Sequence, residues 1–402
     1  MAPSGQLDLT SFRGEWPALL ECVSPAFDSQ RLAKLARSVD WFRLLDLAEE
    51  HGVLGHLAVR LHELDPNLVP AEVTGALLER HRAQVFSTLR ITAELFRLLK
   101  LLATEHIEAL VVKGPVLDKQ AYGDLSMRYY GDLDLLVRQR DIRRATESLQ
   151  AAGYQATVPL SAIDAGKIPG QYLFSKPDAN LIVELHNDLT LRYFPRRLPL
   201  ERFFARRVLV RLDSHEAPAL AVEDELVYIC VHGATHLWER LGWIADVAGL
   251  VTRQSDIDWH ASLETAKEVG AERMVHTGLL LASAVLHARL PATVLAVVER
   301  DVGAAKLAAG VCNWLTAARN ARPTLFERAA FRLRMRGSGF LAPAYLLRLS
   351  FSPTEEDWQM GAAEGRHGFL AALRRPFRLA RKYGRADKIL SLRPWFSKKN
   401  PR

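Results

Sequence analysis

Asp132, Asp134 and Glu184 have residue types and a spacing that could hold a metal ion. The first two stand two positions apart in the apolar segment 130–137, YGDLDLLV. In a β-strand, residues two apart project from the same face, so the two carboxylates lie together while the leucines between them face a core. Their repulsion favours a bound divalent cation, and Mg²⁺ prefers carboxylate and phosphate oxygens. The pair therefore predicts Mg²⁺, with Mn²⁺ as the alternative ion, at a phosphoryl-transfer site.

Glu184 belongs to a second strand-like segment, 180–186 (NLIVELH), in which polar and apolar residues alternate. Glu184 and His186 share one face of this segment. We expect Glu184 to be the third carboxylate, which either completes the metal site or acts as a general base. His186 is a candidate substrate-binding residue.

A tight turn upstream has the features of a phosphate-binding turn. The apolar segment 107–112 is typical of a buried strand, and Lys113-Gly114-Pro115 follows it and opens a helix. The backbone N–H groups and dipole at such a helix start attract phosphate. We expect Lys113, Gly114 and Arg128 to bind the phosphates of a nucleotide. The alternative for Lys113 is an exposed lysine of the turn.

The elements that must position these residues divide the chain into four regions. Helical spacing dominates the first hundred residues, then strands alternate with helices, and then helical spacing returns. This order predicts an α+β protein with a small β-sheet core between predominantly helical N- and C-terminal regions. The predicted regions are a helical N-terminal region at 1–95, the α/β core at 96–210, a helical domain closing the site at 211–318 and a basic helical region at 319–402.

The same residues carry a resemblance to a known family. The segment 112–137, VKGPVL…YGD…RYYGDLDLLV, together with LQAAGY at 149–154, resembles the uncharacterised nucleotidyltransferase family. That family is related to the polymerase-β-type nucleotidyltransferase superfamily. The resemblance implies a mixed-sheet nucleotidyltransferase core, Mg²⁺, a nucleoside triphosphate (NTP) donor and pyrophosphate release, but no particular acceptor. The superfamily pattern of a glycine turn, two strand acids and a later strand acid maps onto Gly114, Asp132, Asp134 and Glu184.

One position departs from the superfamily pattern. The glycine of the turn is usually followed by a serine, whose hydroxyl and N–H hold phosphate, whereas Pro115 offers neither group. The charge of Lys113 could compensate. Without that compensation, a site that binds a nucleotide but does not transfer it is the better interpretation.

A segment with helical spacing, from about residue 225 to 250, carries rings and basic groups. Its period places His232, His236, Arg240 and Trp243 along one face. Similar helices accompany the catalytic core of the family, so His232, His236 and Arg240 are candidate substrate-binding residues. The alternative is helix packing with hydrogen-bonded histidines. A zinc-protease helix is excluded because glycine follows the first histidine where glutamate is required.

The basic charge of the chain is concentrated at its C-terminal end. The formal net charge is +7, yet residues 366–402 alone carry twelve Lys and Arg against one acid, so the other residues sum to about −4. This end is the candidate contact for RNA or another polyanion, with a solvated basic helix at 369–383 as the alternative. The three separated cysteines, the lack of a leader pattern and the lack of a 20-residue apolar run favour a cytoplasmic protein without a transmembrane segment.

These observations predict an Mg²⁺-dependent nucleotidyltransferase whose acceptor is RNA, a protein or a small molecule. Two alternatives stay open. One is a non-catalytic nucleotide- or RNA-binding module. The other is a nucleotide-sugar glycosyltransferase in which the same two aspartates bind Mn²⁺, although its longer nucleotide-binding region has no counterpart upstream. The sequence does not indicate an oligomeric state.

Overall fold

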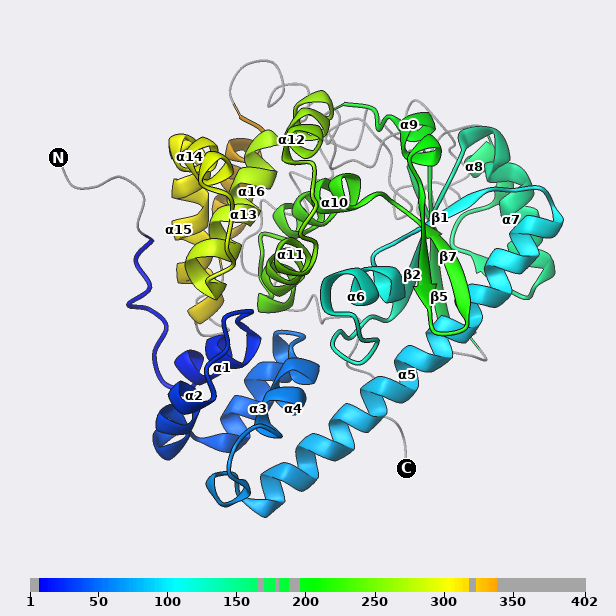
Figure 1. The fold of residues 1–402 in the computed structure, drawn as a ribbon. Coiled ribbons are helices and arrows are strands. Elements are labelled where there is room, and N and C mark those ends of the chain that lie inside the picture. The colour runs from blue at the N-terminus through cyan, green and yellow to red at the C-terminus, as the bar shows by residue number, and fades with distance from the viewer. Residues whose placement is uncertain (1–6, 165–169, 178–180, 188–195, 318–322, 338–402) are drawn as a thin grey trace.

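The fold is α+β, as the sequence predicts, with many helices and one mixed seven-stranded sheet (Figure 1). The structure is a computed structural model that describes residues 7–164, 170–177, 181–187, 196–317 and 323–337. The predicted basic helix at 369–383 lies outside these residues. Among the helices that are described, none combines the length and the apolar composition that crossing a bilayer requires.

The helices fall into three groups along the chain. Those before the first strand are α1 (Trp16–Val23), α2 (Ser29–Leu35), α3 (Trp41–Glu50), α4 (Leu54–Leu61) and α5 (Ala71–Thr104). Those between strands are α6 (Gly114–Tyr122), α7 (Ile142–Ala151), α8 (Leu160–Asp164) and α9 (Leu200–Ala205). Those after the last strand are α10 (Val222–Thr235), α11 (Leu241–Arg253), α12 (Trp259–Glu268), α13 (Glu272–Leu286), α14 (Ala292–Arg300), α15 (Val302–Thr316) and α16 (Leu325–Arg334).

The sheet places the predicted acid-bearing strands side by side at its centre. The strand order is β3-β4-β5-β2-β1-β7-β6, in which β2 is antiparallel to β1 and parallel to β5. The strands are β1 (Ala109–Val112), β2 (Asp132–Val137), β3 (Gln155–Ala156), β4 (Gln171–Lys176), β5 (Leu181–His186), β6 (Val208–Leu212) and β7 (His215–Ala219). The four-region division of the chain stays a prediction, although the sheet itself reaches as far as Ala219.

Each face of the sheet contributes to a different hydrophobic core. Leu133 and Leu135 of β2 face one core, which also contains residues of α5 and α7. Leu136 faces the opposite core, which it shares with α6, α10 and α11. Because side chains alternate along a strand, Asp132 and Asp134 lie on the same face as Leu136. The acids therefore project toward α6 and α10.

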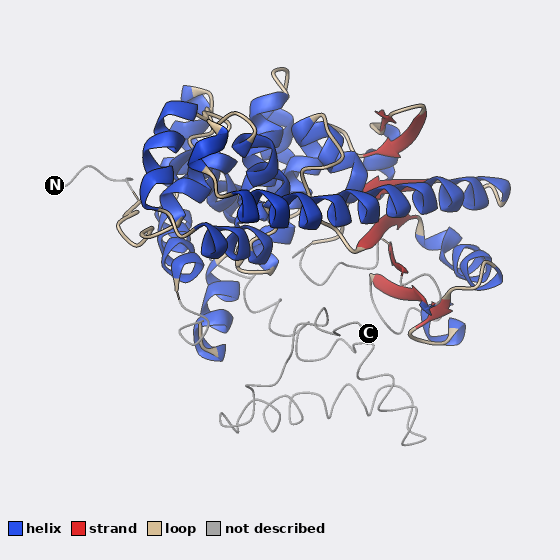
Figure 2. Cartoon of the chain, turned by 90° about the horizontal axis from the view of Figure 1, so that it is seen from below, coloured by secondary structure: helices blue, strands red, loops and turns tan. Residues whose placement is uncertain are grey.

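Helix α5 connects the two ends of the molecule. Val73 and Leu77 near its start pack in the helical core, whereas Leu95 and Leu98 farther along pack in the core under the sheet. The two views show this long helix running from the N-terminal helices to the strands (Figures 1 and 2). It ties the sheet to the helical part of the chain.

The structure differs from the sequence prediction in one helix near the site. The segment expected to be continuous from about residue 225 to 250 is broken between α10 and α11, where Leu237 and Trp238 both have positive φ angles. Trp238 is fully buried, and its ring packs so closely on Gly233 that a Cβ there would overlap it. The burial of this large ring against a glycine turns the chain out of the helix.

The three cysteines, Cys22, Cys230 and Cys312, are buried and free.

Candidate active site

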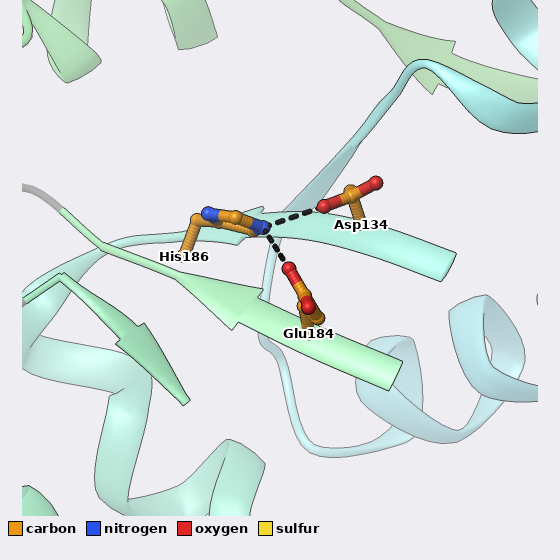
Figure 3. A group of neighbouring side chains, drawn as sticks. All are labelled: Asp134, Glu184 and His186. Atoms are coloured by element: carbon orange, nitrogen blue, oxygen red, sulfur yellow. Dashed lines mark hydrogen bonds and ion pairs between the residues drawn. The ribbon is translucent and has the colours of Figure 1, made fainter. Parts of the chain in front are cut away.

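The register of β2 and β5 brings the predicted acids together. Asp134 pairs with Glu184, and Asp132 pairs with Ile182 one pleat away. The ring of His186, two residues after Glu184, lies beside the Asp134 and Glu184 carboxylates. Its Nε2 lies 2.7 Å from Asp134 Oδ1 and 3.5 Å from Glu184 Oε2 (Figure 3). The parallel pairing of two strands thus converts two separate sequence patterns into one cluster.

Lys113 completes this cluster from the neighbouring strand. Val112, the last residue of β1, pairs with Asp134, so Lys113 follows directly beside it. The Lys113 ammonium lies 2.9 Å from Asp134 Oδ2, and only 13% of its side chain is exposed. The lysine is therefore part of the acid cluster and not an exposed lysine of the turn.

Lys113 and His186 supply the countercharge that buried Asp134 needs. Burial alone would raise the pKa of Asp134, but Lys113 and His186 outweigh it and hold that pKa well below its usual range. Burial would likewise lower the pKa of both cations. The carboxylates reverse this effect, so the pKa of His186 rises to about 9 and that of Lys113 rises as well. The cluster is a network of charged groups packed between the sheet and α10.

Asp132 has the opposite electrostatic character to Asp134. Burial and the nearby charge of Asp134 raise its pKa to about 6, and the attraction of Lys113 does not compensate. Its carboxylate is the member of the cluster that most lacks countercharge.

The turn after β1 is held in a conformation that favours glycine. Lys113 has φ 57° and ψ −145°, and Gly114 has φ 50°. The Lys113 backbone N–H donates to the carboxylate of Glu225 at 3.1 Å, and Glu225 is completely buried in α10. A strained residue persists only where its surroundings hold it, and this hydrogen bond is one such restraint. Pro115 stands in the first turn of α6, where its missing N–H is tolerated.

Arg128 approaches the turn but is bound on its other side by Asp246 of α11. Its Nε and Nη2 donate to the two Asp246 oxygens at 2.6 and 3.1 Å, and its Nη1 donates to the Gly114 carbonyl at 3.2 Å. Tyr122 donates to the same Asp246 at 3.1 Å. A bidentate pair of this kind fixes the guanidinium. The structure thus links Arg128 to the phosphate-type turn through the Gly114 carbonyl.

Rings from α10 and α11 extend outward from Lys113. The Lys113 ammonium lies 3.4 Å from His232 Nδ1, and the His232 and His236 ring centroids are 4.7 Å apart. Trp243 contacts both histidines, at 5.6 and 5.1 Å between centroids. Burial, followed by the nearby charge of Lys113, lowers the pKa of His232. The Arg240 guanidinium carbon lies 5.9 Å from the centroid of the Trp243 ring. The predicted residues thus lie together although α10 and α11 are separate helices.

The carboxylate cluster fits a divalent cation by its donor chemistry. Single donor atoms of Asp134, Glu184 and His186 lie within 4.8 Å of one another, and Asp132 adds an undercompensated carboxylate nearby. Hard divalent cations take carboxylate oxygens as ligands. Two of the three predicted metal-binding residues, Asp134 and Glu184, are thus in one place with His186, while Asp132 pairs with Ile182 one pleat away.

Two residues that bind this cluster were not foreseen as members of the site. Glu225 is 112 positions from the lysine that it restrains. Gln171 on β4 donates a short hydrogen bond to the Glu184 carboxylate. A buried glutamate within an apolar helix was the available signal for Glu225, whereas nothing in the local sequence marked Gln171.

Among the comparisons with known proteins, a family profile bears on this site. A family profile described as uncharacterised nucleotidyltransferase matches residues 37–287, which include the turn, the strand acids and the histidines. A search of curated proteins gave no match. A solved structure of an antigenic nucleotidyltransferase-like protein from Paracoccidioides brasiliensis is similar at 14% identity and a TM-score of 0.25, over 51% of this chain and 97% of that one. That structural similarity is too low to support an argument about this chain. Since the profile covers more than half of its length, the chain belongs to the uncharacterised nucleotidyltransferase family.

Proposed function

We propose that this protein moves a nucleoside monophosphate from an NTP to an acceptor, with release of pyrophosphate and dependence on Mg²⁺. Membership of the family supports nucleotidyl transfer in general. The observation that carries the specific proposal is the in-register pairing of Asp134 with Glu184 beside Lys113. The family also favours this reaction over the glycosyltransferase alternative.

The metal in this proposal is held by Asp132, Asp134 and Glu184. Mg²⁺ is the proposed ion, with Mn²⁺ as the alternative, because the donors are carboxylates. Bound there, the ion would polarise phosphoryl oxygens and neutralise developing charge. His186, which already contacts Asp134 and Glu184, would keep both carboxylates in place.

The residues of the chain have distinct parts in the transfer. A nucleophilic oxygen of the acceptor attacks the α-phosphorus of the NTP, while the bond from that phosphorus to the bridging oxygen breaks and pyrophosphate leaves with the electron pair. Glu184 takes the proton of the acceptor, because its side chain is 16% exposed whereas that of Asp134 is 4% exposed. Lys113 stabilises the negative charge that builds on the phosphates.

A non-catalytic nucleotide-binding role is the second candidate, and the turn favours it. Pro115 has no N–H, and the N–H of Lys113 already donates to Glu225. Two donors that a phosphate-binding turn would normally offer are therefore missing. If these donors are essential for transfer, the protein binds a nucleotide without reacting.

A labelling experiment tests the proposal and identifies the acceptor. Purified protein is incubated with Mg²⁺, each NTP labelled at the α-phosphate, and separate fractions of RNA, protein and small molecules. We expect label on one fraction, and we expect a parallel γ-label to appear in pyrophosphate and on no acceptor. Binding of the NTP without label on any fraction would favour the second candidate.

The matched variants of this experiment are the Asp132→Ala, Asp134→Ala double variant and Glu216→Ala. Glu216 is an exposed acid on β7 of the same sheet, so its loss controls for removal of a strand carboxylate. Transfer should vanish in the double variant and persist in the control. Undiminished transfer by a folded double variant would contradict the proposal.

A further inference from the structure

The two cations that the sequence assigns to phosphate are already neutralised by acids. Lys113 is paired with Asp134, and Arg128 is held by both oxygens of Asp246. A triphosphate carries several negative charges, and charge-assisted hydrogen bonds are the strong means of holding them. The phosphates beyond the reacting one therefore need cations that have no acid partner.

Two arginines near the ring cluster are of this kind. Arg240 is exposed and Arg332 is partly buried, and neither forms an ion pair with an acid among the residues that the structure describes. Desolvation of the ring, followed by the charges of Lys113, Arg332 and Arg240, lowers the pKa of His236 to about 4, so both arginines are near enough for their charges to act on a neutral imidazole. Arg328, one turn before Arg332 on α16, is different, because it forms a short ion pair with Glu239.

The rings form a continuous path from the acid cluster to Arg240, whose guanidinium lies over the Trp243 ring. His232 lies against the Lys113 ammonium, His236 lies against His232, and Trp243 lies against both histidines. His232 and Trp243 are partly buried, whereas His236 and Arg240 are exposed. The path thus leads from the interior of the site to its surface.

The connection that carries His236 and Arg240 is held rigidly. Leu237 and Trp238 both have positive φ angles, which are unusual for residues with side chains. The Trp238 N–H donates to the Gly233 carbonyl at 2.8 Å, and its ring fills a slot against Gly233 and Gly278. The backbone positions of His236 and Arg240 therefore lie on either side of a fixed residue.

We propose that Arg240 and Arg332, with the His236 imidazole near them as a hydrogen-bonding group, form a cationic strip that binds the phosphate chain of the NTP from the helical side of the site. Trp243 lies between the two histidines and Arg240 and forms the floor of the strip. Arg128 then acts on the turn and not on phosphate. This inference rests on the proposed function, because it names the groups that would hold the donor of that reaction.

Binding of inorganic triphosphate, ATP and adenosine to the full-length protein tests the strip by calorimetry. In the Arg240→Ala, Arg332→Ala double variant, we expect triphosphate and ATP to bind at least about ten-fold more weakly. Each lost hydrogen bond to a charged phosphate oxygen removes a large part of the binding free energy. Binding of adenosine should not change, because adenosine has no phosphate. Arg328→Ala is the matched control on the same helix and should bind all three ligands like the natural protein. Triphosphate binding within two-fold of the natural protein in a folded double variant would overturn the inference.

The same variants separate this inference from the proposed function. If the double variant transfers label with an unchanged KM for NTP, the strip is wrong while nucleotidyl transfer stands. If no transfer is ever detected but triphosphate binding depends on Arg240 and Arg332, the strip stands and the proposed reaction is wrong.

Discussion

The sheet side and the helix side of the site use carboxylates in opposite ways. On the sheet side, Asp132, Asp134 and Glu184 crowd together and share two cations. On the helix side, Glu225 and Asp246 stand apart, and each binds its own group of the turn region. Crowded carboxylates repel one another until a metal ion or a proton relieves them, whereas a single carboxylate that accepts a hydrogen bond fixes the geometry of its donor. Glu225 does so although burial raises its pKa to about 7. The difference separates residues placed for chemistry from residues placed for positioning.

The largest effect should come from Asp132→Asn on the sheet side. We expect transfer to fall by about 1000-fold or more, since metal-assisted charge stabilisation contributes several kcal/mol. The variant should nevertheless be more stable than the natural protein at pH 7.5 in EDTA. An acid whose folded pKa is about 6 against an ordinary 3.8 binds its proton more tightly when folded, so its ionisation costs stability as the pH rises from about 4 to 6.

Urea unfolding at pH 4 and pH 7.5 measures the predicted gain in the stability of Asp132→Asn. The gain in the Asn variant should be about 1–3 kcal/mol at pH 7.5 and should shrink toward pH 4. A variant that loses stability at pH 7.5 would show that Asp132 is a positioning acid like those of the helix side.

The next largest effect should come from Asp246→Ala on the helix side. Removing one partner leaves the Arg128 guanidinium buried without its carboxylate, which costs about 3–5 kcal/mol of unfolding free energy. Thermal and urea unfolding would detect it. A loss of unfolding free energy below about 1 kcal/mol would mean that the Arg128–Asp246 pair does not fix the turn. The helix side would then not differ from the sheet side in the way proposed.

Glu225→Ala should lower kcat about 10- to 100-fold, because the strained turn at Lys113 loses its restraint. Glu225→Gln keeps an oxygen that accepts the Lys113 N–H and should restore most of the activity. Steady-state kinetics of the two variants distinguish positioning from chemistry. If Gln is as defective as Ala, the charge of Glu225 takes part in the reaction itself.

The smallest effect should come from Gln171→Ala, which removes the hydrogen bond to Glu184 within the sheet. Outer contacts to a metal-binding carboxylate are worth about ten-fold in metal affinity, so the Mg²⁺ concentration for half-maximal transfer should rise by about that factor. Activity at saturating Mg²⁺ should stay close to that of the natural protein. An unchanged Mg²⁺ requirement would remove Gln171 from the site.

The sheet side was largely predictable because the alternation of side chains along each strand is local. Two-residue periodicity places Asp132 with Asp134, and Glu184 with His186, on shared faces. The prediction of β1, β2 and β5 was close to the observed strands, and the register of β2 with β5 completed it. Periodicity could not indicate that the His186 imidazole would contact the Asp134 carboxylate on the neighbouring strand.

The helix side was not predictable because its contacts join distant segments. Glu225 and Asp246 lie 112 and 118 positions from the groups that they bind. Nothing in the sequence around Asp246 indicates Arg128 as its partner, which only the fold selects. The break between α10 and α11 depends on a slot in which Gly278, from α13, helps to receive Trp238, and helical periodicity carries no signal of such a slot.

One measurement tests the central claim most directly, namely transfer of the α-phosphate label by an Asp134→Asn, Glu184→Gln double variant beside Glu216→Gln. The assay uses Mg²⁺ and the acceptor fraction that the natural protein labels, with circular dichroism to confirm folding. We predict that the double variant loses transfer while Glu216→Gln retains it. Transfer at the natural rate by the folded double variant would contradict the account, because the paired strand carboxylates would then have no part in the reaction.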